Sequence, residues 1–260
     1  MNLNLDDKVF IVTGGASGIG KAVCKAIAEE NGIAVIVDRD SKKNDVLLNE
    51  IKADGKKAEA VQIELTNDDG CRQLIETVVQ KYGRIDGLVN NAGTNDGVSL
   101  ESGSPQAFER SLRINLVHYF ALSHYALPHL KKSTGSIINV SSKVSVTGQG
   151  GTSGYAASKG GINALTREWA CEMLPYGIRV NCVIPAEVNT PQYATWLQSQ
   201  PDKDEKLNKI LSRIPLEKRF TTPEEIANAI VFLLSEKSSH TTGQILFVDG
   251  GYIHLDRALT

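Results

Sequence analysis

Tyr155 and Lys159 stand four positions apart in a stretch whose apolar spacing predicts a helix over 154–174. On a helix both side chains leave the same face, one turn from each other, and Ser153 is the expected N-cap. A free tyrosine has a pKa of about 10, and a neighbouring ammonium favours the phenolate. The pair therefore predicts a tyrosine of lowered pKa that acts as a general base or acid. A packed ring beside a solvated amine is the structural alternative.

A glycine-rich turn, TGGASGIG at 13–20, joins a predicted strand to a predicted helix. Glycines at such a turn let backbone amides and the helix N-terminus approach a pyrophosphate. The spacing is TGxxxGxG, which differs from the common GxGxxG fingerprint of dinucleotide-binding folds. The expected contacts with the dinucleotide are Gly14, Ser17, Gly18, Ile19 and Gly20.

Asp38 ends the second predicted strand. A carboxylate here can accept hydrogen bonds from the adenosine ribose of NAD, and it would repel the 2′-phosphate of NADP. At about 5 Å and an effective dielectric near 20, this repulsion is roughly 3 kcal/mol per unit charge before screening. Arg39 would offset the repulsion if it turned inward, so NAD is the expected cofactor and NADP the alternative. A solvated strand-end aspartate is the structural explanation.

Three further polar residues lie at predicted strand ends or inside a predicted helix. Asn91 follows the fourth strand and begins a turn that would pass close to the cofactor. Ser142 follows the fifth strand, and the Gly- and Ser-rich loop after it can bring it beside Tyr155, where its hydroxyl would bind a substrate oxygen. Asn115 lies in a helical segment that asparagine disfavours, so it would hold a water or distort the helix. Alternatively, Ser142 and Asn115 only satisfy backbone groups.

Short β-branched runs alternate along the chain with longer segments of helical spacing. This alternation indicates a parallel sheet covered on both faces, and right-handed crossovers make it a doubly wound, seven-stranded Rossmann sheet. We expect one α/β domain over 1–260, with a helical flap over 186–214 that covers the substrate. The expected strands are 8–12, 34–38, 58–63, 87–90, 136–140, 179–183 and 244–248, and the expected helices are 18–30, 42–53, 68–82, 105–130, 154–174 and 223–234.

The chain has 260 residues and a formal net charge of −2, so charge gives no reason to expect nucleic acid or an acidic membrane as a partner. We expect no signal peptide and no membrane span, because neither pattern occurs. The four cysteines are scattered, and we interpret them as reduced core thiols of a cytoplasmic protein. The histidines at 118, 124 and 129 lack the spacing of a metal pair and are interpreted as structural or surface residues, so no metal site is expected.

Together these motifs resemble those of the short-chain dehydrogenase/reductase family in order and spacing: TGxxxGxG at 13–20, NNAG at 90–93, and Asn115, Ser142, Tyr155 and Lys159. The likeness extends along the whole chain, with NxVxP at 181–185 and Asp-Gly-Gly at 249–251. The resemblance implies hydride transfer with NAD(P), in which Tyr155 takes the substrate hydroxyl proton. Lys159 would lower the pKa of Tyr155 and hold the nicotinamide ribose. Ser142 would orient the substrate oxygen, and Asn115 would hold a water of the proton relay.

The same resemblance implies further cofactor contacts and reveals two departures. The family usually has Pro-Gly where this chain has Pro185-Ala186, and many members have an aspartate near Glu64, beside the adenine. The implied additional cofactor contacts are Glu64, Leu65, Asn91, Ala92, Gly93, Pro185, Val188 and Thr190.

Within the family, the stretches NNAGTNDG, SSKVSVTGQGGTSGY, IPAEVNTPQY and DGGYIHLDRAL resemble bacterial L-fucose dehydrogenases. That likeness implies oxidation of the anomeric hydroxyl of L-fucose or a related aldose to the lactone. Polar side chains around the crevice suit a sugar, because a site of hydrogen-bonding groups rejects ligands that leave those groups unpaired. The expected substrate contacts are Asn95, Ser142, Gln149, Tyr155, Glu187 and Trp196.

Two other functions stay open. One is an NADPH-dependent β-ketoacyl carrier-protein reductase, for which the lysines at 131 and 132 would form a docking patch, and the other is a non-catalytic dinucleotide sensor. Members of the family commonly form tetramers, so a homotetramer is expected. The tail after Gly251, with His254, Asp256 and Arg257, would then pack across a subunit boundary.

Overall fold

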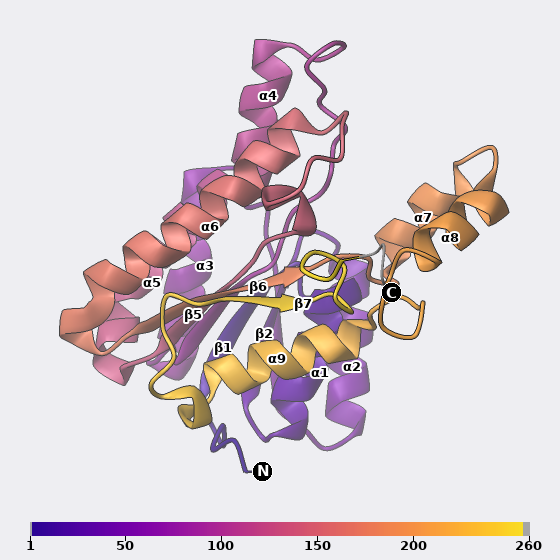
Figure 1. Ribbon diagram of the computed structural model, residues 1–260. Helices are drawn as coiled ribbons and strands as arrows, with labels where there is room; N and C mark the ends of the chain where they lie inside the picture. The colour runs from indigo at the N-terminus through magenta and orange to yellow at the C-terminus, as the bar shows by residue number, and fades with distance from the viewer. Residues whose placement is uncertain (1, 257–260) are drawn as a thin grey trace.

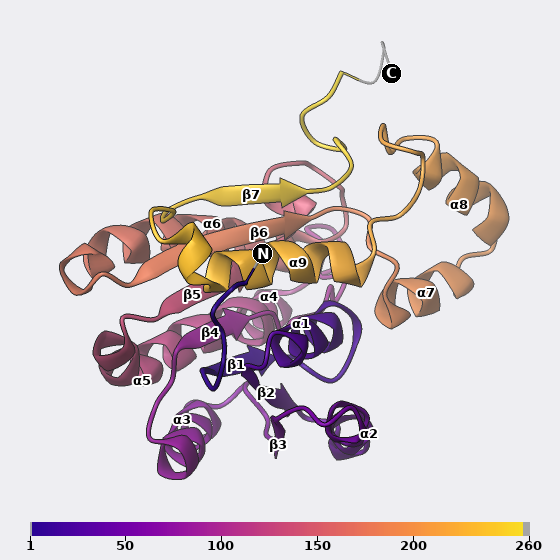
Figure 2. The same cartoon turned by 90° about the horizontal axis from the view of Figure 1, so that it is seen from below.

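Seven parallel strands form one sheet in the computed structural model, which describes residues 2–256. The strands are β1 (Val9–Thr13), β2 (Ile33–Asp38), β3 (Ala58–Gln62), β4 (Gly87–Asn90), β5 (Ser136–Val140), β6 (Arg179–Pro185) and β7 (Ile245–Val248). Their spatial order is β3-β2-β1-β4-β5-β6-β7, so the winding reverses between β1 and β4 (Figure 2). The predicted doubly wound Rossmann sheet is confirmed, and ligands of such sheets bind at the carboxyl ends of the strands near this reversal.

Helices cover both faces of the sheet (Figures 1 and 2). One face carries α1 (Gly18–Glu29), α2 (Ser41–Ala53) and α9 (Pro223–Leu234), and the other carries α3 (Asp68–Tyr82), α5 (His118–Ser133) and α6 (Ser153–Met173). The five inner strands are buried on both sides and read as nearly continuous apolar runs, and each face of the sheet has its own apolar core, whereas the edge strands β3 and β7 are only partly buried. Three 3₁₀ turns lie in the connections after β5, α6 and α9: Lys143–Ser145, Leu174–Tyr176 and Glu236–Ser238.

The expected helix over 105–130 is interrupted in the structure. After α4 (Pro105–Leu112) comes a π-helical turn, Arg113–Val117, and only then α5. Asn115 lies in this turn with its side chain fully buried, and its Nδ2 donates to the carbonyl of Ser111 at 3.1 Å. Of the two roles expected for Asn115, distortion of the helix is the one that the backbone displays.

The other helix and strand ends lie within two residues of their predicted positions. The expected N-cap of α6 is wrong, because Thr152 occupies the cap position and Ser153 is the first helical residue. Neither the apolar period nor the residue types distinguish two adjacent hydroxyl residues as caps, so tertiary contacts decide between them.

Two helices between 186 and 214 stand outside the layers of the sheet (Figure 1). These are α7 (Pro191–Gln198) and α8 (Lys203–Leu211), and none of their residues is buried. Thr190 caps α7, since its hydroxyl accepts the backbone N–H of Tyr193 at 3.2 Å, and a proline in the first turn suits a helix start. Local capping, more than core packing, therefore stabilises this segment.

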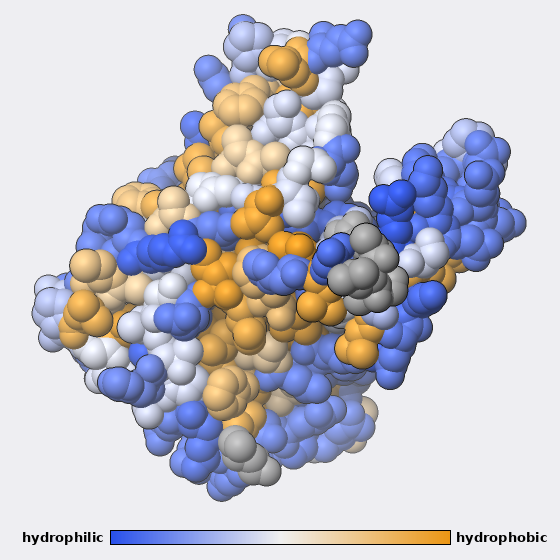
Figure 3. Space-filling view, in the orientation of Figure 1, coloured by the Kyte–Doolittle hydropathy of each residue, from blue (hydrophilic) through white to orange (hydrophobic). Residues whose placement is uncertain are grey.

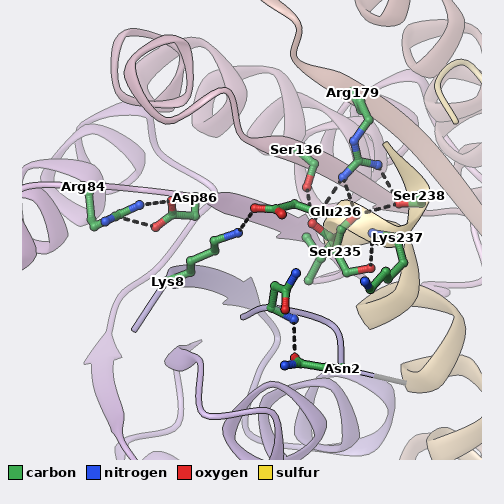
Figure 4. Close-up of polar contacts among 12 residues, drawn as sticks. Asn2, Lys8, Arg84, Asp86, Ser136, Arg179, Ser235, Glu236, Lys237 and Ser238 are labelled. Atoms are coloured by element: carbon green, nitrogen blue, oxygen red, sulfur yellow. Dashed lines mark hydrogen bonds and ion pairs between the residues drawn. The ribbon is translucent and has the colours of Figure 1, made fainter. Parts of the chain in front are cut away.

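Charged side chains form hydrogen bonds and ion pairs at the amino-terminal edge of the sheet (Figure 4). Arg179, at the start of β6, donates to the last carbonyls of α9 at 2.7–3.2 Å and to the hydroxyl of Ser238 at 2.8 Å. Asp86, just before β4, accepts from Arg84 at 2.6 Å and from the backbone N–H of Val9 at 2.9 Å. The arginine therefore caps the negative end of α9, and the aspartate joins β4 to β1.

Three of the four cysteines are buried as expected. Cys171 is exposed on α6, so the interpretation as a core thiol is wrong for that residue. Among residues 2–256, no helix combines the length and the apolarity that crossing a bilayer requires.

In the predicted interface tail, the ring of His254 packs edge-on against Phe247 of β7, with 4.4 Å between ring centroids. Arg257, predicted as part of the same tail, lies outside the described residues.

Candidate active site

A cavity of about 770 Å³ lies at the carboxyl ends of the strands. The ends of β2, β5 and β6 contribute to its wall, together with residues of α7, and Figure 3 shows the surface hollowed between the α7–α8 segment and the rest of the molecule. Most of the predicted cofactor contacts line it: Gly14, Ser17, Gly18, Ile19, Asp38, Glu64, Leu65, Asn91, Ala92, Gly93, Tyr155, Lys159, Pro185, Val188 and Thr190. The position of the cavity is the one that the doubly wound topology predicts.

The glycine turn has the shape that a dinucleotide needs. Gly14 adopts φ +63°, in the left-handed region, and a side chain there would press on the neighbouring NNAG turn. Gly20 does not line the cavity: a Cβ on it would lie 2.1 Å from the carbonyl oxygen of Gly14, so this glycine lets α1 pack against the turn. Gly20 therefore has a packing role in place of the predicted direct contact with the dinucleotide. The remaining residues leave an open cradle at the N-terminus of α1, which fits a pyrophosphate.

The NNAG turn is tied to the glycine turn through Thr13. The hydroxyl of Thr13 accepts the backbone N–H groups of Asn91 at 2.9 Å and Ala92 at 3.0 Å, while the Asn91 side chain donates to the Thr13 carbonyl at 2.8 Å. The side chain of Asn91 is thus used inside the protein. It shapes the cavity wall by holding two turns together.

At the adenosine end, Asp38 is half-buried and its Oδ1 accepts the backbone N–H of Asp40 at 3.1 Å. Arg39 and Lys43 line the same part of the cavity. Glu64 is exposed, and its carboxylate accepts the backbone N–H of Thr66 at 3.1 Å. This end therefore presents a carboxylate beside two cations, which suits a ribose and a charged nucleotide.

Tyr155, Ser142 and Lys159 converge on the inner wall of the cavity. Ser142 hydrogen-bonds to the phenolic oxygen of Tyr155, an interaction that favours the phenolate. The Nζ atom of Lys159 lies 5.5 Å from the centroid of the Tyr155 ring, on the same face of α6. The spacing of the sequence placed these side chains together correctly.

The prediction that the pKa of Tyr155 is lowered is wrong for the chain without a bound ligand. Burial raises the pKa of Tyr155 to about 12, and the hydrogen bond with Ser142 offsets this only in part. Burial also lowers the pKa of Lys159 to about 8. The ammonium of Lys159 is directed elsewhere: it donates to the carbonyl of Val140 at 2.8 Å and to the hydroxyl of Tyr119 at 3.2 Å.

Asn115 lies behind Gly93 rather than in the cavity wall. Its Oδ1 accepts the backbone N–H of Thr94 at 2.7 Å, and a Cβ on Gly93 would lie 2.8 Å from that oxygen. Asn115 therefore orders the end of the NNAG turn. Lys159 Nζ would lie 3.6 Å from the same Cβ position, so both side chains approach Gly93 closely.

The predicted substrate residues divide into two groups. Glu187 is buried, forms an ion pair with Lys143, and accepts a hydrogen bond from Tyr193, which lines the cavity. Lys143 also lies over the ring of Tyr252, 4.6 Å from its centroid. This charged, hydrogen-bonded cluster adjoins the cavity through Tyr193 and through Lys143, which follows Ser142 in the chain, but Lys143 and Glu187 are not themselves lining residues.

The other predicted substrate residues lie farther out. Asn95 is exposed and its Oδ1 accepts the backbone N–H of Gly97 at 3.2 Å, so it caps a loop. Gln149 is exposed, and Trp196 is 41% exposed on α7, edge-on to Tyr193 at 5.2 Å between centroids. None of these three lines the cavity in the described structure.

Sequence reasoning missed residues of α5 and its π turn. Ile114 and His118 line the cavity, although His118 was interpreted as a structural or surface residue. Tyr119 is fully buried and contacts Lys159. One signal was present: Tyr119 lies four residues after Asn115, so an α-helical face through Asn115 also contains Tyr119.

Comparison with known proteins agrees with the fold and with the motifs. A family model described as enoyl-(acyl carrier protein) reductase matches residues 14–253. The chain belongs to the short-chain dehydrogenase/reductase family, whose members are NAD(P)-dependent oxidoreductases.

Two curated relatives carry different functional names. The 3-oxoacyl-(acyl-carrier-protein) reductase FabG of Thermotoga maritima is 40% identical over 253 residues, covering 96% of this chain and 100% of the relative. An L-fucose dehydrogenase of Oryctolagus cuniculus is 36% identical over 245 residues, covering 94% and 84%. The expected family is confirmed, but the L-fucose dehydrogenases among these relatives are mammalian, so a particular likeness to the bacterial enzymes is not shown.

Solved structures of similar proteins include sugar enzymes. The crystal structure of Cj0485 dehydrogenase is 47% identical with a TM-score of 0.94, covering 100% of this chain and 99% of that one. The Thermoplasma acidophilum aldohexose dehydrogenase is 30% identical with a TM-score of 0.89, covering 99% and 98%. The L-sorbose reductase of Gluconobacter frateurii, in complex with NADPH and L-sorbose, is 27% identical with a TM-score of 0.93, covering 98% and 100%.

Proposed function

We propose that this chain oxidises the anomeric hydroxyl of an aldose, L-fucose or a close relative, to the lactone with NAD. The observation that carries the proposal is the ion pair between half-buried Lys143 and buried Glu187, which adjoins the cavity: Lys143 directly follows Ser142 in the chain, and Glu187 accepts a hydrogen bond from the cavity-lining Tyr193. A carboxylate has about four lone-pair sites and an ammonium has three donors, so the pair has hydrogen-bonding capacity beyond its mutual contact. A sugar hydroxyl can use that capacity, whereas an acyl chain would leave it unpaired.

In this proposal Tyr155 accepts the proton of the anomeric hydroxyl while the C–H bond at the same carbon breaks and its electron pair leaves as hydride. When the sugar binds, Ser142 turns its one hydroxyl proton from the phenolic oxygen to the substrate oxygen and holds that oxygen near the phenol. NAD held in the cavity would supply the hydride acceptor. The anomeric group loses a proton from its oxygen and a hydride from its carbon, so the lactol becomes a lactone and the Tyr155 phenolate becomes the neutral phenol.

The phenolate needs support, since burial raises the pKa of Tyr155 to about 12. Before the sugar binds, the hydrogen bond from Ser142 favours the phenolate. We propose that the Lys159 ammonium, which lies on the same face of α6 as Tyr155, also favours it as a nearby positive charge. Lys159 would also hold the ribose next to the nicotinamide, and Asn115 would hold the NNAG turn and a water of the proton relay.

The substrate side is completed by the helical segment 186–214, which we propose covers the bound sugar. Tyr193 of α7 lines the cavity and donates to Glu187, so the segment is joined to the charged cluster. Trp196 packs on Tyr193, and it could cover an apolar sugar face if the segment moved inward. Asn95 and Gln149 would reach the sugar only through such loop movement.

The preference for NAD rests on Asp38. Its carboxylate lines the cavity where an adenosine ribose would lie, and it would repel a 2′-phosphate. Arg39 and Lys43 also line the cavity, and their positive charges would attract a 2′-phosphate. The similar L-sorbose reductase contains NADPH. Both cofactors therefore belong in the assay.

A 3-oxoacyl carrier-protein reductase is the second candidate, because the relative of that name is 40% identical over nearly the whole chain. The Lys143–Glu187 pair, which is joined to the cavity through Tyr193, argues against it, since a thioester with an acyl chain has fewer hydrogen-bonding groups than a sugar to offer such a pair.

The test is a panel of L-fucose, D-arabinose, L-galactose, polyols and ketones with both cofactors, together with reduction of an acetoacetyl thioester with NADPH. We expect the highest kcat/KM for an aldose with NAD. Glu187→Gln should raise the aldose KM by roughly tenfold or more, as loss of a charge-assisted hydrogen bond predicts. The control Glu168→Gln removes an exposed carboxylate on α6 and should change nothing. Thioester reduction faster than every aldose oxidation would overturn the proposal.

We also propose a homotetramer. Figure 3 shows apolar residues gathered over β7 and α9, where Phe232 is 38% and Leu246 is 39% exposed. Burial of this surface against a second copy would cover it. Sedimentation at micromolar concentration, with a monomer as the contrary result, tests this assembly.

A further inference from the structure

Lys159 is a buried cation whose partners are neutral. Its side chain is 2% exposed, and its ammonium donates to the Val140 carbonyl at 2.8 Å and to the Tyr119 hydroxyl at 3.2 Å. No carboxylate within the described part of the chain contributes to its charge state, and burial lowers its pKa to about 8. The two hydrogen-bond acceptors are therefore what keeps the ammonium charged in this environment.

The orientation of the Tyr119 hydroxyl follows from its surroundings. Tyr119 is 0% exposed, and its phenolic oxygen lies 3.1 Å from the Val140 carbonyl as well as 3.2 Å from Lys159 Nζ. An ammonium has no lone pair, so the hydroxyl proton can only go to Val140. The lone pairs of the phenolic oxygen are thereby directed at Lys159.

This arrangement fixes the remaining donor of Lys159. An ammonium has three N–H groups, and Tyr119 and Val140 take two of them. Lys159 lines the cavity, and its Nζ approaches Gly93 of the NNAG turn. The third N–H is thus left for the cavity side, where the proposed reaction needs it.

We propose that Tyr119 is a positioning residue of the active site, whose hydroxyl holds the Lys159 ammonium in its charged, cavity-facing orientation. The proposal rests on the catalytic assignment of Tyr155 and Lys159 given above. It accounts for a fully buried tyrosine hydroxyl whose two partners are a catalytic lysine and the last carbonyl of β5.

A consequence for pH dependence follows with a definite sign. The titratable groups around Lys159 are Tyr155 on its own helix, His118 and Tyr119 on α5, and Cys182 on β6. Without the Tyr119 hydroxyl the ammonium has one acceptor fewer, so the pKa of Lys159 falls. The loss of activity on the alkaline side, where Lys159 gives up its proton, then moves to lower pH.

The experiment is Tyr119→Phe, assayed for aldose oxidation across pH and for thermal denaturation. We expect kcat to fall roughly tenfold, the value for one hydrogen bond to a charged group, with the aldose KM unchanged. The alkaline decline should begin about one pH unit lower. The fold should survive, because the Val140 carbonyl keeps its bond to Lys159.

Two other variants make the result specific. Tyr125→Phe removes a hydroxyl from the same helix that bonds only Asp68 on the surface, and it should leave kcat and the pH profile unchanged. Tyr155→Phe should abolish turnover. If Tyr155→Phe stays active, the catalytic assignment fails. If Tyr155→Phe is inactive while Tyr119→Phe keeps the wild-type kcat and alkaline decline, only the role of Tyr119 is overturned.

Discussion

A cationic side chain lies at each end of the β-sheet, and the two differ in their hydrogen-bond partners. At the amino-terminal edge, Arg179 donates four hydrogen bonds at 2.7–3.2 Å to the end of α9 and to Ser238 (Figure 4). At the carboxyl-terminal edge, Lys159 donates to two neutral oxygens and is directed at a cavity. The first cation caps a helix terminus, whereas the second lines the cavity and has only two neutral oxygens as hydrogen-bond partners within the described structure.

Asp86 at the amino-terminal edge and Asp38 at the carboxyl-terminal edge differ in the same way, in how many hydrogen bonds each accepts within the protein. Asp86 accepts from Arg84 and from the backbone of β1, so both of its oxygens are used within the protein. Asp38 accepts only the N–H of Asp40 within the described structure, and it lines the cavity. Polar groups saturated by the fold contribute stability, and groups left unsaturated at one edge of the same sheet are available for binding.

The largest expected effect is on activity, from Lys159→Met. Turnover should fall by at least about 10³-fold, because the group that supports the base and the cofactor is lost. Stability at pH 7 should nevertheless rise, by up to about 3 kcal/mol, since the pKa of Lys159 is lowered from 10.5 to about 8 by burial of its charge.

The size of this stability gain depends on pH. Below pH 8 both the folded and the unfolded state carry the Lys159 proton, and the folded state bears the full desolvation penalty. Between pH 8 and 10.5 the unfolded state binds more protons, so wild-type stability rises with pH relative to the variant. Urea unfolding of both proteins at pH 7 and pH 10 measures this. A variant less stable than wild type at pH 7 would show that Lys159 stabilises the fold.

An intermediate effect is expected on cofactor choice, from Asp38→Ala. The ratio of kcat/KM with NAD to that with NADP should fall by about 10²-fold, the equivalent of roughly 3 kcal/mol of charge repulsion. Asp54→Ala, an exposed carboxylate at the end of α2, removes the same charge away from the cavity and serves as the control. An unchanged ratio would place Asp38 among the structural aspartates such as Asp86.

The smallest effect on activity belongs to Arg179→Met. The free energy of unfolding should fall by about 2 kcal/mol, because several carbonyls at the C-terminus of α9 lose a cationic donor, and Tm should drop by roughly 4–8 °C. The kcat should stay at the wild-type value. Lys237→Met removes an exposed cation from the same corner and should leave Tm unchanged. A lower kcat at full stability would mean that the two ends of the sheet are coupled.

The secondary structure was largely predictable because its signals are local. Seven apolar runs alternate with helical periods, and their ends differ from the predicted ones by at most two residues. The exception is the interrupted helix before α5, where Asn115 bonds to Thr94 and Ser111. Thr94 reaches Asn115 only through the fold, so a helical pattern alone does not reveal the π turn.

The site was predictable in part for the same reason. Residues at strand ends or one helical turn apart, such as Asp38 and the Tyr155–Lys159 pair, were located correctly because topology brings strand ends together. Polarity is the signal that predicts Asn95 and Gln149 as substrate contacts, and both residues lie on exposed loops. Polarity states what a side chain can bind but not which way its loop faces.

By itself the sequence determined the parallel sheet, the family and the set of groups able to carry a proton. Those follow from periodicity and from spacing along the chain. The tertiary structure decided their charge states: burial raises the pKa of Tyr155, and Tyr119 and Val140, each far from Lys159 in sequence, receive its ammonium. Desolvation and hydrogen bonding depend on which atoms surround a group in space, and distant segments of the chain supply most of those atoms.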